Sequence, residues 1–354
     1  MATKPNPKDS MKSTWRLGDR SKWTRSHWLI DLVDGHHVAL DTPVPVHSKA
    51  DKIPYMPQWP QHLWVIFYAL IPLALHQAWL SYTGHQRLGK IAALILYFTA
   101  FNAVAIREIH ILRRLAHKYG FLDGDVHERD GVPDAGAGKV TASLVKTTGS
   151  RLAMAIVLSY NPSTPPAAAL GDWTWWMWLS LEIGLYCIIL DFWFYWYHRA
   201  MHDVPFLWKY HRTHHLTKHP NPLLTAYADH EQEFFDMVGV PFMTYLTFRA
   251  IGLPLGFYDW WICHQYVVFT EVWGHSGLRI HLSPPTTMSW FLQMFEAEIV
   301  IEDHDLHHRK GWRKSHNYGK QTRLWDRIFG TCTDRIESVE ANIDYNNQAH
   351  MPIF

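Results

Sequence analysis

Histidines crowd one part of this 354-residue sequence in spacings that suit metal binding. The chain has 25 histidines, and fourteen of them lie between His198 and His316. Each buried imidazole needs a hydrogen-bond partner, so a cluster this dense is rarely explained by packing alone. The spacings H-x-x-x-H and H-x-x-H-H place imidazoles on one face of a helix, where they can address one ion. The sequence therefore predicts a metal site.

The candidate ligands fall into five stretches that border apolar segments. They are His198 and His202; His211, His214 and His215; His230; His275; and His304, His307 and His308. A lone H-x-x-x-H is more often an incidental surface pair, but two copies of H-x-x-H-H, the first of them just after such a pair, are hard to obtain by chance. No separate catalytic residue is identified.

The number of candidates bears on the choice of metal, because imidazole itself suits zinc, copper, iron and nickel. A tetrahedral zinc site takes four protein ligands, or three and a water. Ten candidates fit two ions of five or six coordination better. Two neighbouring irons can activate dioxygen to attack an unactivated C–H bond, and a site beside membrane helices can receive a lipid-like substrate.

Two other functions remain open at this point. A zinc-dependent membrane hydrolase would work without oxygen. A non-catalytic metal-binding or transport protein would line a path through the membrane with histidines, whereas these histidines gather at the ends of apolar segments.

Long apolar segments predict an all-α integral membrane protein with four or more transmembrane helices and a cytoplasmic, histidine-rich helical cap. The clear segments are 62–82, 91–112 and 173–197, and 234–271 is expected to form two helices broken at Gly252, Pro254 and Gly256. Each is near the roughly 20 residues that cross a bilayer. The segment 141–160 is weakly apolar, yet it must cross or re-enter if the histidines are to lie on the cytoplasmic side.

These segments suggest an order of domains along the chain. We expect a polar N-terminal arm at 1–60, a transmembrane hairpin at 61–117, a connector at 118–172, a catalytic domain at 173–333 and a tail at 334–354. Arg107 lies near the end of the second segment, and Arg113, Arg114 and Lys118 follow it; these cations favour a cytosolic position for that end. In a eukaryote, we expect the endoplasmic reticulum membrane.

Composition limits the partners. Aromatic residues make up 15% of the chain and charged residues 18%, and the formal net charge is +1. No overall field therefore attracts nucleic acid. The three cysteines are too scattered for a disulfide framework or a thiolate cluster.

The histidine stretches resemble the fatty acid hydroxylase superfamily, which includes sterol desaturases, sterol 4-methyl oxidases and alkylglycerol monooxygenases. The matching stretches are D-F-W-F-Y-W-Y-H-R-A-M-H at 191–202, then H-R-T-H-H, A-D-H-E-Q-E, G-H-S-G and H-D-L-H-H, and finally N-Y-G-K-Q-T-R-L-W-D-R-I-F-G-T at 317–331. They occur in the family's order from about residue 173 to 333. G-H-S-G followed by E-D-H-D-L-H-H leans towards sterol 4-methyl oxidases.

The resemblance implies two irons held by about ten histidines, dioxygen as oxidant, and electrons from NAD(P)H through a b-type cytochrome or a reductase. It assigns nine of the candidate histidines as ligands. At His230 the family usually has a histidine followed by proline, whereas Glu231 follows here; we expect His230 to be a ligand too, and the alternative is that it supports a ligand without touching the metal. The implied function is hydroxylation, or desaturation, of a lipid, sterol or terpenoid-like substrate, and hydroxylation is favoured.

Five carboxylates are candidate partners of the ligands, because metal-bound imidazoles usually donate their second N–H to a carboxylate or a carbonyl. Asp303 and Asp305 flank His304, and Asp326 lies in the W-D-R-I-F-G-T stretch. Glu233 follows His230 by three residues. Asp191 lies in an apolar run, where a carboxylate is a functional candidate by default.

Overall fold

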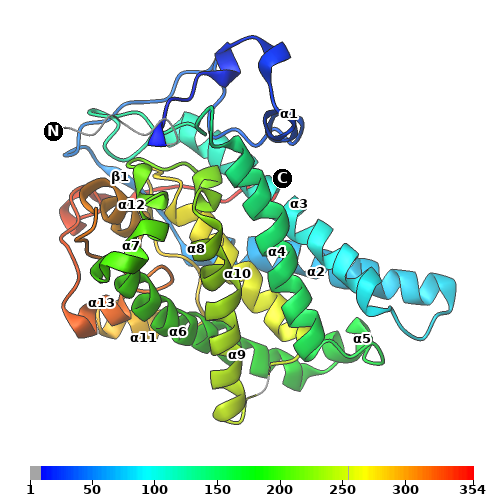
Figure 1. Cartoon of the computed structure of the whole chain (residues 1–354). Helices are drawn as coiled ribbons and strands as arrows, with labels where there is room; N and C mark the ends of the chain where they lie inside the picture. Colours follow the sequence, from blue (N-terminus) through cyan, green and yellow to red (C-terminus); the bar gives the residue numbers. More distant parts are fainter. Residues whose placement is uncertain (1–8, 254) are drawn as a thin grey trace.

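The structure is a computed structural model that describes residues 9–253 and 255–354, and most of these residues are helical, as predicted (Figure 1). The helices are α1 (Arg25–Leu32), α2 (Gln58–Thr83), α3 (Lys90–Tyr119), α4 (Ala137–Ser159), α5 (Pro166–Leu170), α6 (Trp173–Asp203), α7 (Pro205–His211), α8 (His230–Phe234), α9 (Val240–Ala250), α10 (Phe257–Gly274), α11 (Ser289–Met294), α12 (Ile301–Lys310) and α13 (Leu324–Phe329). Short 3-10 helices η4 (His214–Leu216) and η5 (Pro222–Ala226) and the short π-helix η6 (Phe235–Gly239) lie between them.

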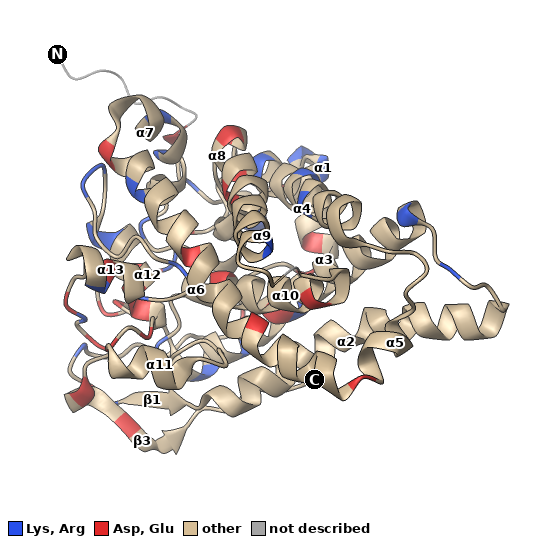
Figure 2. Ribbon diagram, turned by 90° about the horizontal axis from the view of Figure 1, so that it is seen from below, with Lys and Arg blue, Asp and Glu red and all other residues tan. Residues whose placement is uncertain are grey.

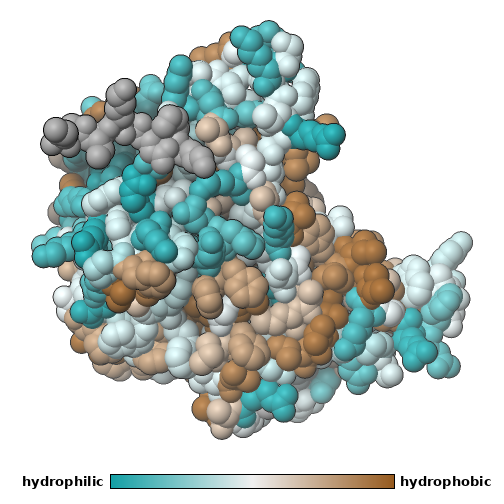
Figure 3. Space-filling view, in the orientation of Figure 1, coloured by the Kyte–Doolittle hydropathy of each residue, from teal (hydrophilic) through white to brown (hydrophobic). Residues whose placement is uncertain are grey.

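Three of the described helices, α2, α3 and α6, are long and apolar enough to cross a membrane. The outward face of α2 shows large apolar side chains at every fourth position. These are Trp59, Leu63, Phe67, Ile71, Leu75 and Trp79, all more than a third exposed. Figure 3 shows hydrophobic residues gathered over the α2, α3 and α4 side of the molecule, while the upper left of this face is hydrophilic. A stripe spaced in this way is suited to contact with lipid.

The length of α6 explains how the histidines leave the apolar layer. Its 31 residues span about 46 Å at 1.5 Å per residue, whereas the hydrocarbon core is about 30 Å thick. Asp172 caps the N-terminus by accepting from the backbone N–H of Thr174 at 2.9 Å. His198 and His202 occupy the last two turns, beyond the length that the bilayer core needs.

Helix α4 includes nearly all of the weakly apolar segment 141–160, and it runs back along α3. Tyr160, just after α4, donates its hydroxyl proton to the carbonyl of Leu88, just before α3, at 2.8 Å. Gly149 in the middle of α4 faces the ring of Phe98. The two helices are therefore antiparallel, and α4 carries the chain back to the N-terminal end of α3, where α6 begins. The C-terminal ends of α3 and α6 consequently lie at the same end of the molecule. Helix α4 is not among the three candidate membrane helices.

Nearly all of the segment 234–271 lies in η6, α9 and α10. Helices α9 and α10 fold back on each other as expected, and the rings of Tyr245 and Trp260 stack between them with centroids 4.6 Å apart. Gly252 has a left-handed φ of 80° and marks the turn, while Pro254 lies outside the described residues. Helix α10 is buried along almost its whole length, and α9 and α10 both pack on α6. Neither is among the candidate membrane helices.

The N-terminal arm and the tail differ from the expectation of a polar arm on an all-helical protein. Strand β1 (Ile53–Met56) pairs in parallel with β2 (His281–Leu282) and β3 (Ile343–Gln348), in the order β2-β1-β3. Ile53 and Met56 are fully buried. Strands this short give almost no periodic signal, and their pairing joins segments far apart in the sequence.

Candidate metal centre

Nine of the ten predicted histidines converge in two adjoining groups. The first group is His198, His202, His211, His215 and His307; the second is His214, His275, His304 and His308. Within each group, one nitrogen from every imidazole lies within 4.8 Å of the others, and all nine side chains are buried. The rings of His215 and His308 stack across the two groups with centroids 4.9 Å apart. The groups are therefore neighbours.

Each H-x-x-H-H motif divides its three imidazoles in the same way. His304 and His308 join the second group from α12, while His307 turns to the first. His211 and His215 join the first group, while His214 turns to the second. On a helix, the side chain at i+4 points more nearly in the direction of the side chain at i than the side chain at i+3 does. One motif can therefore supply ligands to two ions.

The hydrogen bonds of the imidazoles show why a cation fits between them. His198 and His307 donate their Nδ1–H to the carbonyls of Tyr318 and His316, each at 2.7 Å. A neutral imidazole that donates from Nδ1 has a bare lone pair on Nε2. Yet Nε2 of His211 lies 3.0 Å from Nε2 of both His198 and His202, whose Nδ1 atoms both donate to carbonyls, so a single proton on His211 cannot satisfy both lone pairs. A positive ion would satisfy these lone pairs.

The spacing of the nitrogens also bears on coordination. Three contacts in the first group, His198 with His211, His211 with His202, and His307 with His215, are each 3.0 Å between Nε2 atoms. For metal–nitrogen bonds of about 2.1 Å, adjacent ligands are about 3.0 Å apart in an octahedron and about 3.4 Å apart in a tetrahedron. Five ligands also exceed the four of a tetrahedral site. The first group fits a five- or six-coordinate ion.

Burial keeps the imidazoles outside the membrane helices neutral. It lowers the pKa of His275 to about 4 and the pKa of His214 to about 3. The same cause lowers the pKa of His304, His307 and His308 well below the usual range. Neutral imidazoles are the form that binds metal ions, so the site is prepared for a metal at neutral pH.

Backbone carbonyls, rather than carboxylates, accept the second N–H of the ligands. Besides the bonds of His198 and His307, His202 donates to Trp312, His275 to Glu271 and His308 to Thr217, at 2.8–2.9 Å, and His214 contacts the carbonyl of Tyr227 at 3.3 Å. None of the five predicted carboxylates hydrogen-bonds an imidazole among the described residues. The expectation that these carboxylates partner the ligands is corrected: Asp303 and Asp305 pair with arginines, and Asp326 accepts backbone N–H groups.

Asp191 and Asp326 instead hold the loop that supplies one of these carbonyls. Asp326 accepts from the backbone N–H of Tyr318 at 2.8 Å and of Gly319 at 2.7 Å. Asp191 accepts from the backbone N–H groups of residues 320–322 at 2.8–3.1 Å. Burial raises the pKa of Asp326 to about 6 although its hydrogen bonds lower it. Both carboxylates thus fix Tyr318, whose carbonyl orients His198.

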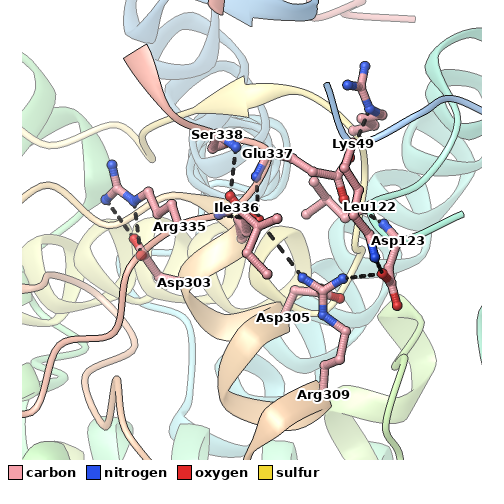
Figure 4. Close-up of polar contacts among 12 residues, drawn as sticks. Lys49, Leu122, Asp123, Asp303, Asp305, Arg309, Arg335, Ile336, Glu337 and Ser338 are labelled. Carbon is pink, nitrogen blue, oxygen red and sulfur yellow. Dashed lines mark hydrogen bonds and ion pairs between the residues drawn. The ribbon is translucent and has the colours of Figure 1, made fainter. Parts of the chain in front are cut away.

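Helix α12 turns its histidines to the metal groups. Its carboxylates point instead into a buried network of charges (Figure 4). Glu302 accepts from the backbone N–H groups of residues 336–338 at 2.6–3.0 Å. Asp303 pairs with Arg335 at 2.7 Å, and Asp305 with Arg129 at 2.5 Å. These pairs attach the tail and the connector to the ligand helix. Buried carboxylates require such partners because their desolvation is costly.

Two predicted residues lie away from both groups. His230 begins α8 with an exposed side chain and joins neither group. The residue after it is Glu231, at the position where the family usually has proline. Glu233 accepts a 2.5 Å hydrogen bond from Ser143, and burial raises its pKa to about 8. It lines an apolar chamber rather than contacting a ligand.

A small cavity beside the histidines shares lining residues with this chamber. The cavity has a volume of about 20 Å³ and is lined by ligands of both groups, among them His198, His214 and His304. The chamber has a volume of about 80 Å³, lies between α3, α4, η5 and α10, and has mostly apolar walls. Thr225 and Glu271 line both spaces. The metal groups therefore adjoin an apolar space between helices.

An ion triad in the small cavity was missed in the sequence. Lys320 Nζ lies 2.6 Å from Asp236 Oδ1 and 2.5 Å from Glu271 Oε1. Glu271 and Asp236 are carboxylates in or beside an apolar run, which is the signal that could have identified them. Arg129 was also missed, because its connector resembles an ordinary loop and its partner Asp305 is 176 residues away.

Comparison with known proteins agrees with this site. Residues 183–331 match the family model described as fatty acid hydroxylase. A fatty acid hydroxylase, vlmA, from Lecanicillium sp is 48% identical over 316 residues, covering 87% of this chain and 86% of that protein. No solved structure gives a significant match.

Two more distant relatives match less than half of the chain. Methylsterol monooxygenase 2-1 of Arabidopsis thaliana is 30% identical over 44% of this chain and 57% of its own length. Alkylglycerol monooxygenase of Xenopus tropicalis is 29% identical over 47% of this chain and 32% of its own length. The lean towards sterol 4-methyl oxidases thus has less support than a resemblance to fatty acid hydroxylases.

Proposed function

The chain belongs to the fatty acid hydroxylase family, and from that premise we propose that it is a membrane di-iron monooxygenase that hydroxylates a lipid chain. The balanced reaction converts R–H, dioxygen, two electrons and two protons into R–OH and water. One oxygen atom enters the substrate and the other leaves as water. The observation that carries the proposal is the pair of adjoining histidine groups that face a cavity next to an apolar chamber.

The nine converging histidines would hold the two ions, five ligands on one and four on the other. Bound iron would supply dioxygen activation and the oxidising power to break a C–H bond. The cavity of about 20 Å³ exceeds the roughly 10–15 Å³ that one water needs, so it has room for a molecule of that size beside the ligands. Carbonyls such as that of Tyr318 keep the Nε2 atoms directed inwards.

The chamber between α3, α4 and α10 would bind the apolar chain. Phe101, Ile109 and Val268 contribute to its walls, and these walls exclude water from the reacting carbon. A narrow space between helices suits a flexible linear chain better than a rigid ring system, and the chain would enter laterally from lipid. The printed name of the 48% identical relative, a fatty acid hydroxylase, supports a fatty acyl substrate.

Electrons would come from NAD(P)H through a b-type cytochrome or a reductase on the cytosolic side. The histidine-bearing end of α6 lies at the same end as the C-terminus of α3, which carries Arg113, Arg114 and Lys118. Positive charges of this kind favour the cytosol. In a eukaryotic cell, the endoplasmic reticulum is the proposed location.

The test is incubation of membranes that contain the chain with isotopically labelled dioxygen and an electron source, followed by mass spectrometry of the lipids. We expect one labelled oxygen per product molecule and two irons per chain in the purified protein. His307→Ala should abolish labelling, and His230→Ala, an exposed histidine outside both groups, is the matched control. A single zinc per chain, or turnover without oxygen, would refute the proposal.

A further inference from the structure

The surface outside the first histidine group has one exposed indole surrounded by cations. Trp312, in the loop after α12, is 39% exposed. The segments 204–218 and 309–316, which cover this group from outside, contain seven Lys or Arg and no Asp or Glu. We call Trp312 together with the exposed cations Lys209, Lys310, Arg313 and Lys314 the Trp312 patch. Figure 2 shows blue segments beside α7 and α12.

The cations of the patch are available to a partner. Arg212 pairs with Asp9, and Arg309 with Asp123, but no ion pair within residues 9–253 and 255–354 involves Lys209, Lys310 or Arg313. The whole chain has a net charge of only +1, so this density of positive charge is local. Such a field attracts an acidic surface and accelerates its association.

A short route of contacts leads from the patch to the ligands. The Trp312 ring meets the buried Trp208 ring with centroids 5.1 Å apart. Trp208 in turn contacts the rings of His202 and His215, at 5.2 Å and 5.7 Å. His202 also donates its Nδ1–H to the Trp312 carbonyl at 2.8 Å. One hydrogen bond therefore separates a surface residue from a ligand of the first group.

We propose that the Trp312 patch is the docking site of an acidic one-electron carrier protein, and that Trp312 and Trp208 connect it to the five-histidine group. The inference rests on the proposed function, which needs two electrons per turnover. Each docking event oxidises the carrier by one electron, so two events complete a turnover. Neither indole lines the small cavity or the chamber, so electrons and substrate arrive by different routes.

A protein carrier fits the patch better than a lipid headgroup does. The patch lies in the histidine-rich cap, beyond the last turns of α6, whereas the apolar stripe of α2 faces outwards along the candidate membrane helices. An anionic lipid would gain nothing from a connection to His202, whereas a redox centre docked at Trp312 would gain a short path.

The first test is binding, measured with the full chain in nanodiscs of phosphatidylcholine, both metal-free and metal-loaded. The probe is the soluble haem domain of an acidic b-type cytochrome. Arg313→Glu/Lys314→Glu should raise the Kd at least tenfold, and binding should weaken with salt. The matched control Lys22→Glu/Arg25→Glu reverses two exposed cations on the N-terminal arm and should change the Kd less than twofold. The proposal would be overturned if the two variants changed the Kd equally. It would also be overturned if the addition of anionic vesicles, with no other change, abolished binding of the haem domain.

The second test separates docking from electron transfer. Trp208→Leu should leave the Kd within twofold and the iron content unchanged, while reoxidation of the reduced haem by the metal-loaded protein slows at least tenfold. Unchanged reoxidation would overturn the assigned path. Because binding is also measured without metal, a selective loss of affinity in Arg313→Glu/Lys314→Glu would support the docking site even if no labelled lipid formed. Labelled product with unaltered binding would refute the docking site and leave the proposed function intact.

Discussion

The buried ion pair between Arg129 and Asp305 should contribute strongly to the stability of the ligand helix. The Arg129 side chain is 1% exposed and the Asp305 side chain is fully buried. Arg129 also donates to the carbonyl of Pro220 at 3.0 Å. Asp305 follows His304 directly, so this pair connects the connector with α12 beside the metal groups.

The expected effect of Arg129→Met depends on which contacts Asp305 and the Pro220 carbonyl keep in the variant. Breaking a buried pair by removing one partner costs about 3–5 kcal/mol. Arg309 stays 3.5 Å from the other oxygen of Asp305, which favours the lower part of that range, and the Pro220 carbonyl loses its donor. We expect a loss of about 3–4 kcal/mol. At roughly 2 °C per kcal/mol for a large domain, the apparent Tm falls by about 6–8 °C.

The assay is thermal unfolding of the metal-free protein in detergent at one scan rate, so that neither bound metal nor scan rate alters the comparison. The control Arg327→Met removes a cation from a surface pair with Glu296 at 2.8 Å, whose side chains are 39% and 81% exposed. Exposed pairs contribute about 0–1 kcal/mol, so this Tm should fall by less than about 2 °C.

A double variant tests the cause. If a stranded buried carboxylate is responsible, Arg129→Met/Asp305→Leu should recover at least half of the lost stability, because two apolar residues can replace a buried pair at little cost. An Arg129→Met protein that melts within 2 °C of the parent, or single effects that simply add in the double variant, would refute the reasoning.

Three further predictions concern the site. Asp326→Asn should weaken metal binding about 10–100-fold in a chelator competition, because the loop whose carbonyl orients His198 is released; unchanged affinity would contradict this role. His215→Ala should reduce iron, measured by elemental analysis, to one per chain or fewer, while exposed His230→Ala keeps two; equal iron in both would show that the first group does not bind an ion. Ala105→Phe, which fills the chamber, should lower turnover of a long-chain lipid about tenfold or more at constant iron content, and normal turnover would place the substrate elsewhere.

The helices and the ligand residues could be predicted largely because their signals are local. An apolar run of spanning length and an i, i+3, i+4 spacing depend only on neighbouring residues. The three clear apolar segments all lie within α2, α3 and α6, and nine of ten candidate histidines meet in space. Belonging to the fatty acid hydroxylase family was confirmed by a relative that covers most of the chain.

The tertiary structure decided features that depend on residues far apart in the sequence. His230 has a suitable side chain, but its position at the exposed start of α8 keeps it outside both groups. The Nδ1 partners are carbonyls such as that of Tyr318, 120 residues from His198. No local pattern encodes which backbone carbonyl will face a given ring.

The sequence by itself determined which side chains could bind metal and which helices could lie in a membrane, since both are properties of residue type and local spacing. Only the tertiary structure decided how the histidines divide into five and four, and how the carboxylates of α12 turn away from them to Arg129 and Arg335. The physical reason is that a helix fixes the angles between its own side chains, whereas packing against distant segments fixes what each side chain meets.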